Sequence, residues 1–101
     1  MQDITVAELK EKLDSGEAFV FIDVRELYEY EEFNLGADLI PLGTLPESIP
    51  SLLQYKDQEI VLHCRSGARS GAAKMTLEQL GFTRVRNLLG GVLEWQRQYG
   101  R

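Results

Sequence analysis

The chain has 101 residues and a formal net charge of −5, with 44% hydrophobic and 27% charged residues. This length suits one domain around one core, and we expect that domain to span residues 1–101. The negative charge argues against a general role on nucleic acid, which favours a basic surface. No apolar run approaches the roughly 20 residues that cross a bilayer, and the N-terminal residues lack a signal-peptide pattern. We therefore expect a cytoplasmic protein that binds neither nucleic acid nor membranes.

Apolar periodicity predicts an alternation of helices and strands. In chain order these are a helix after Thr5 that stops at Ser15-Gly16, a strand at 18–22, a helix at 26–32, a short strand at 38–41, a helix at 44–54, a strand at 59–63, a helix that Gly81 closes, a strand at 84–87 and a final helix after Gly90-Gly91. Thr5-Val6-Ala7-Glu8 has the form of a capping box, in which Glu8 reaches back to Thr5. The helix at 44–54 is expected to be short or broken, because Pro46 suits a first turn better than Pro50 suits an interior.

The strands at 18–22 and 59–63 are continuous apolar runs, which are typical of strands covered on both faces in a parallel sheet. Strands that alternate with helices indicate right-handed crossovers. We therefore predict a three-layer α/β fold, with a mostly parallel central sheet of about five strands and helices on both of its faces.

Cys64, the only cysteine, is the strongest candidate for chemistry. It follows a buried strand and opens a loop whose backbone N–H groups can point inward, while the next helix adds its positive N-terminal end. A thiolate in that ring is stabilised, so we expect the pKa of Cys64 to lie below the free value of about 8.5. The residues expected to bind an anionic substrate beside it are Arg65, Ser66, Gly67, Ala68 and Arg69.

Gly67 lets the loop backbone approach closely, and Arg65 and Arg69 supply positive charge. A lone cysteine can also be a small buried hydrophobe, but such a cysteine does not need a glycine and two arginines in the next five residues. One cysteine and one histidine exclude an intramolecular disulfide and make a structural zinc site implausible, so we expect no metal.

Several nearby residues are candidates for supporting roles, and one of them is Ser70, which directly follows Arg69. His63 and Cys64 should point to opposite faces, so His63 is expected to orient the loop through hydrogen bonds rather than to act as a general base. Asp23 either anchors an arginine or the loop backbone or simply ends a strand, and Arg25 either supports the site or forms a solvated pair with Glu26. Trp95 belongs either to the core or to the wall of the pocket.

A buried strand, then Cys64-Arg65-Ser66-Gly67-Ala68-Arg69-Ser70, then a helix resembles the active-site loop of the rhodanese family of sulfurtransferases. Further matching segments cover nearly the whole chain: Asp23-Val24-Arg25-Glu26, Gly36-Ala37-Asp38-Leu39-Ile40-Pro41, and Asn87-Leu88-Leu89-Gly90-Gly91-Val92 with Trp95. Glu32-Phe33-Asn34 departs from the Gly-His-Ile that many members carry. Because that histidine is usually structural, the change concerns local packing more than catalysis.

The resemblance implies a sulfurtransferase of the thiosulfate type that forms a persulfide on Cys64 and needs no metal or organic cofactor. The thiolate attacks the sulfane sulfur of thiosulfate or a related persulfide donor, and a thiol or cyanide acceptor takes the sulfur in a second step. The implied partners are a small anionic sulfur donor and a thiol or protein acceptor. Arg65 makes mercaptopyruvate a less favoured donor, since its users typically carry a Cys-Gly-x-Gly loop. We expect a monomer or a weak homodimer.

Two other functions remain in view. A cysteine-dependent phosphatase or arsenate reductase also uses a cysteine in an anion-binding loop, but it places five residues between cysteine and arginine. Only four residues separate Cys64 from Arg69, which tightens the ring around one sulfur atom. A non-catalytic binding or regulatory module is the other alternative, which a missing cysteine or a degraded loop would mark.

Overall fold

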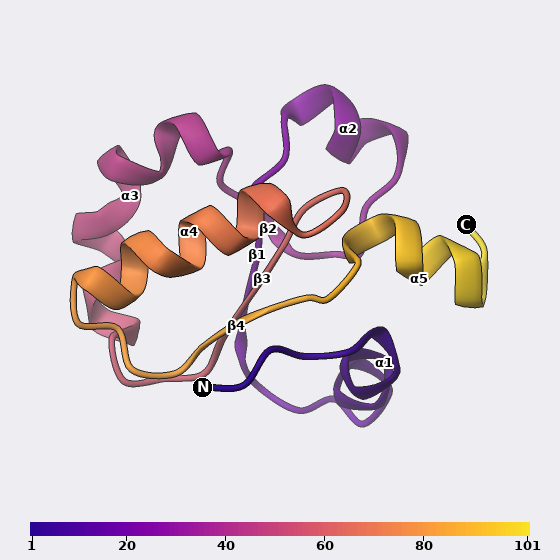
Figure 1. Ribbon diagram of the computed structural model, residues 1–101, viewed down its shortest axis with the longest axis horizontal. Coiled ribbons are helices and arrows are strands. Elements are labelled where there is room, and N and C mark those ends of the chain that lie inside the picture. The colour runs from indigo at the N-terminus through magenta and orange to yellow at the C-terminus, as the bar shows by residue number, and fades with distance from the viewer.

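Four parallel strands form the centre of the molecule in the computed structural model, which describes residues 1–101 (Figure 1). The sheet order is β2-β1-β3-β4, with bounds β1 (Val20–Asp23), β2 (Asp38–Leu39), β3 (Ile60–His63) and β4 (Val85–Asn87). Asp23 at the end of β1 is in register with His63 at the end of β3. The polar ends of these two strands therefore lie side by side at the carboxyl edge of the sheet, as the sequence predicted.

Five α-helices surround the sheet: α1 (Val6–Asp14), α2 (Leu27–Glu32), α3 (Leu45–Leu52), α4 (Ala68–Gln79) and α5 (Gly91–Tyr99). Helices α3 and α4 lie on one side of the strands, and α1 and α5 lie on the other (Figure 1). This confirms the predicted three-layer α/β fold.

Alternation along the strands supplies a separate apolar cluster to each face. The cluster under α3 and α4 includes Ile22, Leu62 and Cys64, and the cluster under α1 and α5 includes Val61, Leu88 and Ile4. Both faces of the central strands are thus buried, which explains why their sequences are continuous apolar runs rather than alternating ones.

The prediction of about five strands was wrong in number. A fifth position at the β4 edge is filled by one residue, Ile4, which forms an isolated parallel bridge with Leu88. Its N–H donates to the carbonyl of Asn87 at 3.0 Å, and its carbonyl accepts from Leu89 at 2.9 Å. The bridge stops there because the next residue, Thr5, is already the N-cap of α1.

The capping box predicted at Thr5 is only half formed. Thr5 Oγ1 accepts the N–H of Glu8 at 3.2 Å, but the Glu8 carboxylate pairs with Arg86 on β4. The buried guanidinium of Arg86 needs carboxylate partners, and Glu8 is one of two that reach it.

Helix α3 is short, as predicted, and gives way to a 3₁₀ turn at Leu53–Tyr55. Pro46 lies in its first turn and Pro50 lies inside it. Because the helix has only eight residues, the N–H that Pro50 lacks costs one intrahelical hydrogen bond near an end.

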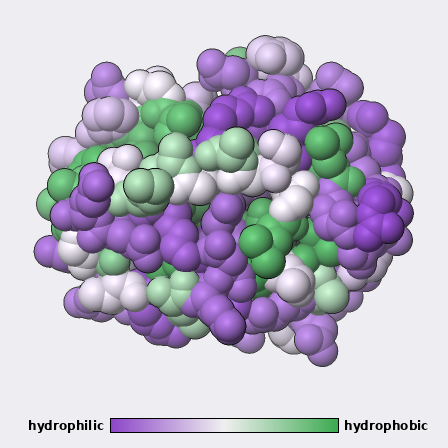
Figure 2. Space-filling model, viewed as in Figure 1, coloured by the Kyte–Doolittle hydropathy of each residue, from purple (hydrophilic) through white to green (hydrophobic).

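The face of the molecule in Figure 2 is mostly hydrophilic, with apolar atoms in separate patches. None of the helices has the length and apolar character needed to cross a bilayer.

Candidate functional site

The candidate site is built where β3 ends and α4 begins. Cys64 follows β3 directly, and α4 starts at Ala68, so residues 64–67 form a short loop at the carboxyl edge of the sheet. The loop lies between α2 and the first turn of α5 (Figure 1). In parallel sheets this edge is where ligands bind.

The Cys64 sulfur lies at the floor of this loop, and the residue is only 1% exposed. Sγ accepts the N–H of Gly67 at 3.1 Å and the N–H of Ser70 at 3.4 Å, and the Ser70 hydroxyl lies 3.3 Å away. Burial raises the pKa of the Cys64 thiol, but hydrogen bonds from Ser70 and from the N–H groups of Gly67 and Ser66 outweigh it and lower the pKa. The loop therefore favours a thiolate without help from a neighbouring general base.

Gly67 is required for its backbone conformation rather than for a close approach within the fold. Its φ is +105°, in the left-handed region that residues with a Cβ rarely adopt. A Cβ built there would meet its nearest neighbour at 3.6 Å, an ordinary contact. The positive φ redirects the chain directly after the N–H that donates to the sulfur, and α4 begins at the next residue.

Asn87, at the end of β4, is a site residue that the sequence did not single out. Its Nδ2 donates to the Gly67 carbonyl at 3.1 Å, and its Oδ1 lies 2.5 Å from the Ser70 hydroxyl. Since a carbonyl can only accept, the amide must face Gly67 with nitrogen and Ser70 with oxygen. Asn87 thus connects Gly67 and Ser70, the two residues that donate hydrogen bonds to the Cys64 sulfur, to the sheet. The signal in the sequence that could have indicated Asn87 is that it is a polar residue at the end of a buried strand.

Arg69 does not stand free beside the sulfur. Its Nη1 and Nη2 donate to the two carboxylate oxygens of Glu29 on α2, at 2.7 and 2.8 Å. These bonds lower the pKa of Glu29 to about 2 and raise that of Arg69. Glu29 is the second residue that the sequence missed, because 40 positions separate the two.

Asp23 and Arg25 form a buried ion pair at the edge of the sheet where the loop begins. Arg25 Nε and Nη2 donate to the Asp23 carboxylate at 2.9 to 3.1 Å, and Nη2 also donates to the Phe33 carbonyl at 2.7 Å. Arg25 is therefore not a solvated partner of Glu26. Of the alternatives for Asp23, the structure shows the one in which it anchors an arginine.

His63 does not orient the loop through hydrogen bonds, contrary to the sequence expectation. It lies on the opposite face of the sheet from Cys64, as predicted, and both of its ring nitrogens lack hydrogen-bond partners. Its ring packs on Phe21 at 5.3 Å between centroids, and its Nε2 is 3.6 Å from Asp23 Oδ2. Burial lowers the pKa of His63 to about 4, even though Asp23 opposes this shift. His63 is thus a neutral packing residue near neutral pH.

The first turn of α5 holds the outer side of the loop. Val92 N–H donates to the Cys64 carbonyl and Leu93 N–H to the Arg65 carbonyl, each at 3.0 Å. These N–H groups have no partner within the helix, and here they satisfy two loop carbonyls. Trp95 lies further along α5 against the Val61 cluster, so it belongs to the core.

The remaining loop residues, Arg65, Ser66 and Ala68, are exposed around the opening. A hollow of about 250 Å³ adjoins Arg65, and its lining residues are Arg25, Glu29, Glu32, Phe33, Arg65, Val92, Leu93, Gln96 and Arg101. It combines cationic, acidic and apolar side chains next to the Glu29–Arg69 pair.

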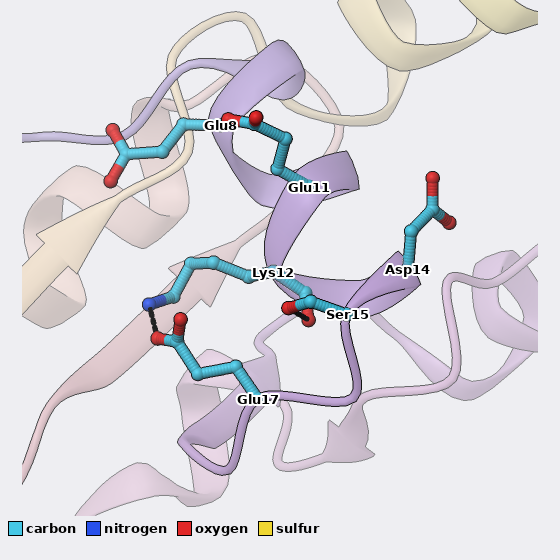
Figure 3. Close-up of a pocket in the computed structure, with 6 residues that line it drawn as sticks. All are labelled: Glu8, Glu11, Lys12, Asp14, Ser15 and Glu17. Atoms are coloured by element: carbon cyan, nitrogen blue, oxygen red, sulfur yellow. Dashed lines mark hydrogen bonds and ion pairs between the residues drawn. The ribbon is translucent and has the colours of Figure 1, made fainter.

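A larger hollow on α1 is lined by neither a cysteine nor a histidine (Figure 3). Its six lining residues are Glu8, Glu11, Lys12, Asp14, Ser15 and Glu17. Figure 3 shows Lys12 directed at Glu17, while Asp14 points away from both. Lys12 also pairs with Glu59 at 2.7 Å, so its charge is used within the fold.

Comparison with known proteins places this loop in a family. The family description "Rhodanese-like domain" matches residues 5–98. "Putative sulfur carrier protein YrkF" of Bacillus subtilis is 36% identical over 94 residues, which are 92% of this chain and 50% of that protein. The tRNA uridine(34) hydroxylase of Cronobacter sakazakii is 36% identical over 94% of this chain and 28% of its own length. The chain thus spans half or less of these curated relatives.

Solved structures of similar length share the fold. A rhodanese-like domain protein from Staphylococcus aureus superposes with a TM-score of 0.82 at 32% identity, covering 94% of this chain and 91% of that one. Human single-domain sulfurtransferase TSTD1 gives 0.81 at 27% identity, covering 95% and 96%. A Rhodopseudomonas palustris protein, described as a "Protein of Unknown Function RPA3614, Possible Tyrosine Phosphatase", gives 0.87 at 25% identity, covering 100% and 83%.

Proposed function

The chain belongs to the family of rhodanese-like domains, and we propose that it is a sulfurtransferase that carries sulfane sulfur as a persulfide on Cys64. The observation that carries this proposal is the cradle around Sγ, where the N–H groups of Gly67 and Ser70 point at one buried sulfur atom. Relatives named as a sulfur carrier and as a sulfurtransferase support the same chemistry.

In the first half-reaction the Cys64 thiolate attacks the outer sulfur of thiosulfate. The new S–S bond forms as the bond between the two donor sulfurs breaks, and sulfite leaves with the electron pair. The total charge is −3 before and after the step. The terminal persulfide sulfur carries the negative charge, which inward N–H groups of the loop stabilise.

In the second half-reaction an acceptor nucleophile attacks the terminal sulfur. Cyanide takes it as thiocyanate, a thiol takes it as a persulfide, and the Cys64 thiolate is regenerated. Because Cys64 is the only cysteine, no second thiol of this chain can resolve the persulfide. We therefore propose that a small thiol or a protein thiol is the acceptor, which implies ping-pong kinetics.

Phosphate-ester hydrolysis is the competing reaction for a cysteine in an anion-binding loop. It requires a ring wide enough for a tetrahedral oxyanion and an arginine free to bind its oxygens. Four residues separate Cys64 from Arg69, and both terminal nitrogens of Arg69 are bonded to Glu29. These two features favour sulfur transfer.

Steady-state assays distinguish the two reactions. With thiosulfate and cyanide, the reduced protein should form thiocyanate with parallel double-reciprocal lines, and Cys64→Ser should form none. An aryl phosphate should not be hydrolysed above the Cys64→Ser background. Aryl phosphate hydrolysis without thiocyanate formation would refute the sulfurtransferase proposal.

A further inference from the structure

The charges around Cys64 restrict the donors that the site can bind. Three arginines lie at this edge of the sheet, and two of them are paired with carboxylates: Arg25 with Asp23, and Arg69 with Glu29. Arg65 is exposed and has no carboxylate partner. Of the two loop arginines that the sequence suggested, only Arg65 is thus available to an anionic donor. Arg101, which lines the adjoining hollow, donates to the Glu32 carbonyl.

We propose that Glu29 is a specificity-determining residue that makes the site favour sulfur donors with one negative charge over the thiosulfate dianion. This inference rests on the proposed sulfur transfer at Cys64. Glu29 acts by occupying Arg69, the loop arginine, and by placing its own carboxylate beside the path of the donor.

The geometry of the pair makes this occupation costly to reverse. A guanidinium offers its two Nη groups as a planar fork, and Glu29 fills that fork with both oxygens, at 2.7 and 2.8 Å. A donor anion that needs the same fork must displace Glu29. The Glu29 side chain is 12% exposed and that of Arg69 35%, so water and salt screen their charges only in part.

The neighbouring hollow provides a surface for a donor with an uncharged substituent. Phe33, Val92 and Leu93 contribute apolar side chains to its lining, and Arg65 and Glu29 lie at the same hollow. An organic substituent loses no charge solvation there, whereas a second anionic group faces the Glu29 carboxylate. The apolar side chains of the hollow therefore favour a donor with an uncharged substituent.

Thiosulfate and methanethiosulfonate form a matched pair of probes. Both present a sulfane sulfur bonded to an oxidised sulfur, and a methyl group in the second replaces one charged oxygen of the first. In both cases the Cys64 thiolate takes the outer sulfur, and the leaving group is sulfite or methanesulfinate. With methanethiosulfonate the total charge is −2 before and after the step. A comparison of the two donors therefore tests the effect of the donor's charge while its shape stays nearly constant.

The test compares kcat/KM for the two donors in the wild-type protein and in Glu29→Gln, with cyanide as acceptor at constant ionic strength. In ping-pong kinetics this constant reports only the first half-reaction. The intrinsic reactivity of each donor cancels when the ratio of kcat/KM for thiosulfate to kcat/KM for methanethiosulfonate is compared between the variant and the wild-type protein. Glutamine keeps one oxygen for Arg69 and for the Glu26 N–H that Glu29 Oε1 accepts at 3.0 Å.

Glu31→Gln is the matched control, because it removes the same charge from an exposed position of α2. We expect Glu29→Gln to raise the ratio about tenfold, mainly through a lower KM for thiosulfate, and Glu31→Gln to leave it unchanged. Thermal melts verify that each variant is folded. If Glu29→Gln does not fold, Glu29→Ala removes the same carboxylate and should shift the ratio in the same direction.

A ratio within twofold of wild type in the folded Glu29 variant, or an equal rise in Glu31→Gln, overturns the inference while both donors still transfer sulfur. If the wild-type protein accepts sulfur from neither donor, the proposed function itself fails.

Discussion

At the scale of single residues, the hydroxyl proton of Ser70 is the one hydrogen-bond donor that the Cys64 sulfur has to share. The Ser70 hydroxyl has a single hydrogen, and two acceptors lie within reach: Asn87 Oδ1 at 2.5 Å and Cys64 Sγ at 3.3 Å. Asn87 cannot turn its nitrogen toward Ser70, because that nitrogen is needed by the Gly67 carbonyl. Asn87 therefore competes with the sulfur for this proton, and the backbone N–H groups are the donors that the sulfur does not share.

Replacing Asn87 with aspartate should weaken the thiolate. The carboxylate keeps the Ser70 proton and adds a negative charge near the sulfur, so we expect the pKa of Cys64 to rise. The pH dependence of Cys64 alkylation by iodoacetamide measures this shift. Asn34→Asp makes the same chemical change at an exposed position and should leave the alkylation profile unchanged. An unchanged profile in folded Asn87→Asp would contradict the role given to Asn87.

At the scale of elements, the loop is assembled by segments that are distant in sequence. Strand β3 delivers Cys64, α4 provides Ser70, β4 provides Asn87, α2 provides Glu29, and the first turn of α5 binds the loop carbonyls. The closest approach is at Gly91, where an added Cβ would lie 2.5 Å from the Cys64 carbonyl oxygen and 2.6 Å from that of Arg65. Glycine at this position lets α5 begin against the loop.

Gly91→Ala should therefore displace α5 from the loop. Gly16→Ala is the control, since Gly16 also has a positive φ, +70° against +57°, but no atom lies within 4 Å of its added Cβ. The control should lose about 1 kcal/mol of unfolding free energy to backbone strain. Gly91→Ala should lose about 1–3 kcal/mol more, because backbone atoms must move, and its sulfur-transfer rate should fall. Equal losses in urea titrations of the two variants would show that α5 does not press on the loop.

Local patterns predicted the fold better than they predicted the contacts of the site. The apolar runs at β1 and β3 and the motif from Cys64 to Ser70 were readable because each lies within a few consecutive residues. The Glu29–Arg69 and Ser70–Asn87 pairs join elements far apart, and nothing in the local sequence distinguishes Glu29 from the other acidic residues of α2. The prediction of a fifth strand was wrong because the N-cap at Thr5 ends the extended segment after Ile4.

At the scale of the whole molecule, burial of His63 between the layers links stability to pH. Its pKa is about 4 in the folded protein, against 6.5 for a free histidine, because burial disfavours the cation. The groups that face it are Asp23, which raises its pKa, and Arg25, which lowers it. Between these two pKa values the unfolded chain binds the proton and the folded protein does not.

The unfolding free energy should therefore fall as the pH is lowered from about 7 toward 4, by at most about 1.4 kcal/mol per pH unit from this group. Urea titrations between pH 7 and 5 isolate the effect, because the carboxylates with lowered pKa values, such as Glu29, lose their contribution only below about 4.5. His63→Phe retains a ring beside Phe21 and should remove the slope. The same slope in His63→Phe would assign it to another group.

The persulfide on Cys64 is the central claim, and intact mass measures it most directly. The reduced protein is incubated with thiosulfate or methanethiosulfonate and desalted, and its intact mass is measured by mass spectrometry. Cys64→Ser is treated in parallel. We predict a gain of one sulfur atom in the wild-type protein, its loss after cyanide is added, and no gain in Cys64→Ser. No gain from either donor, or an equal gain in Cys64→Ser, would contradict sulfur transfer at this site.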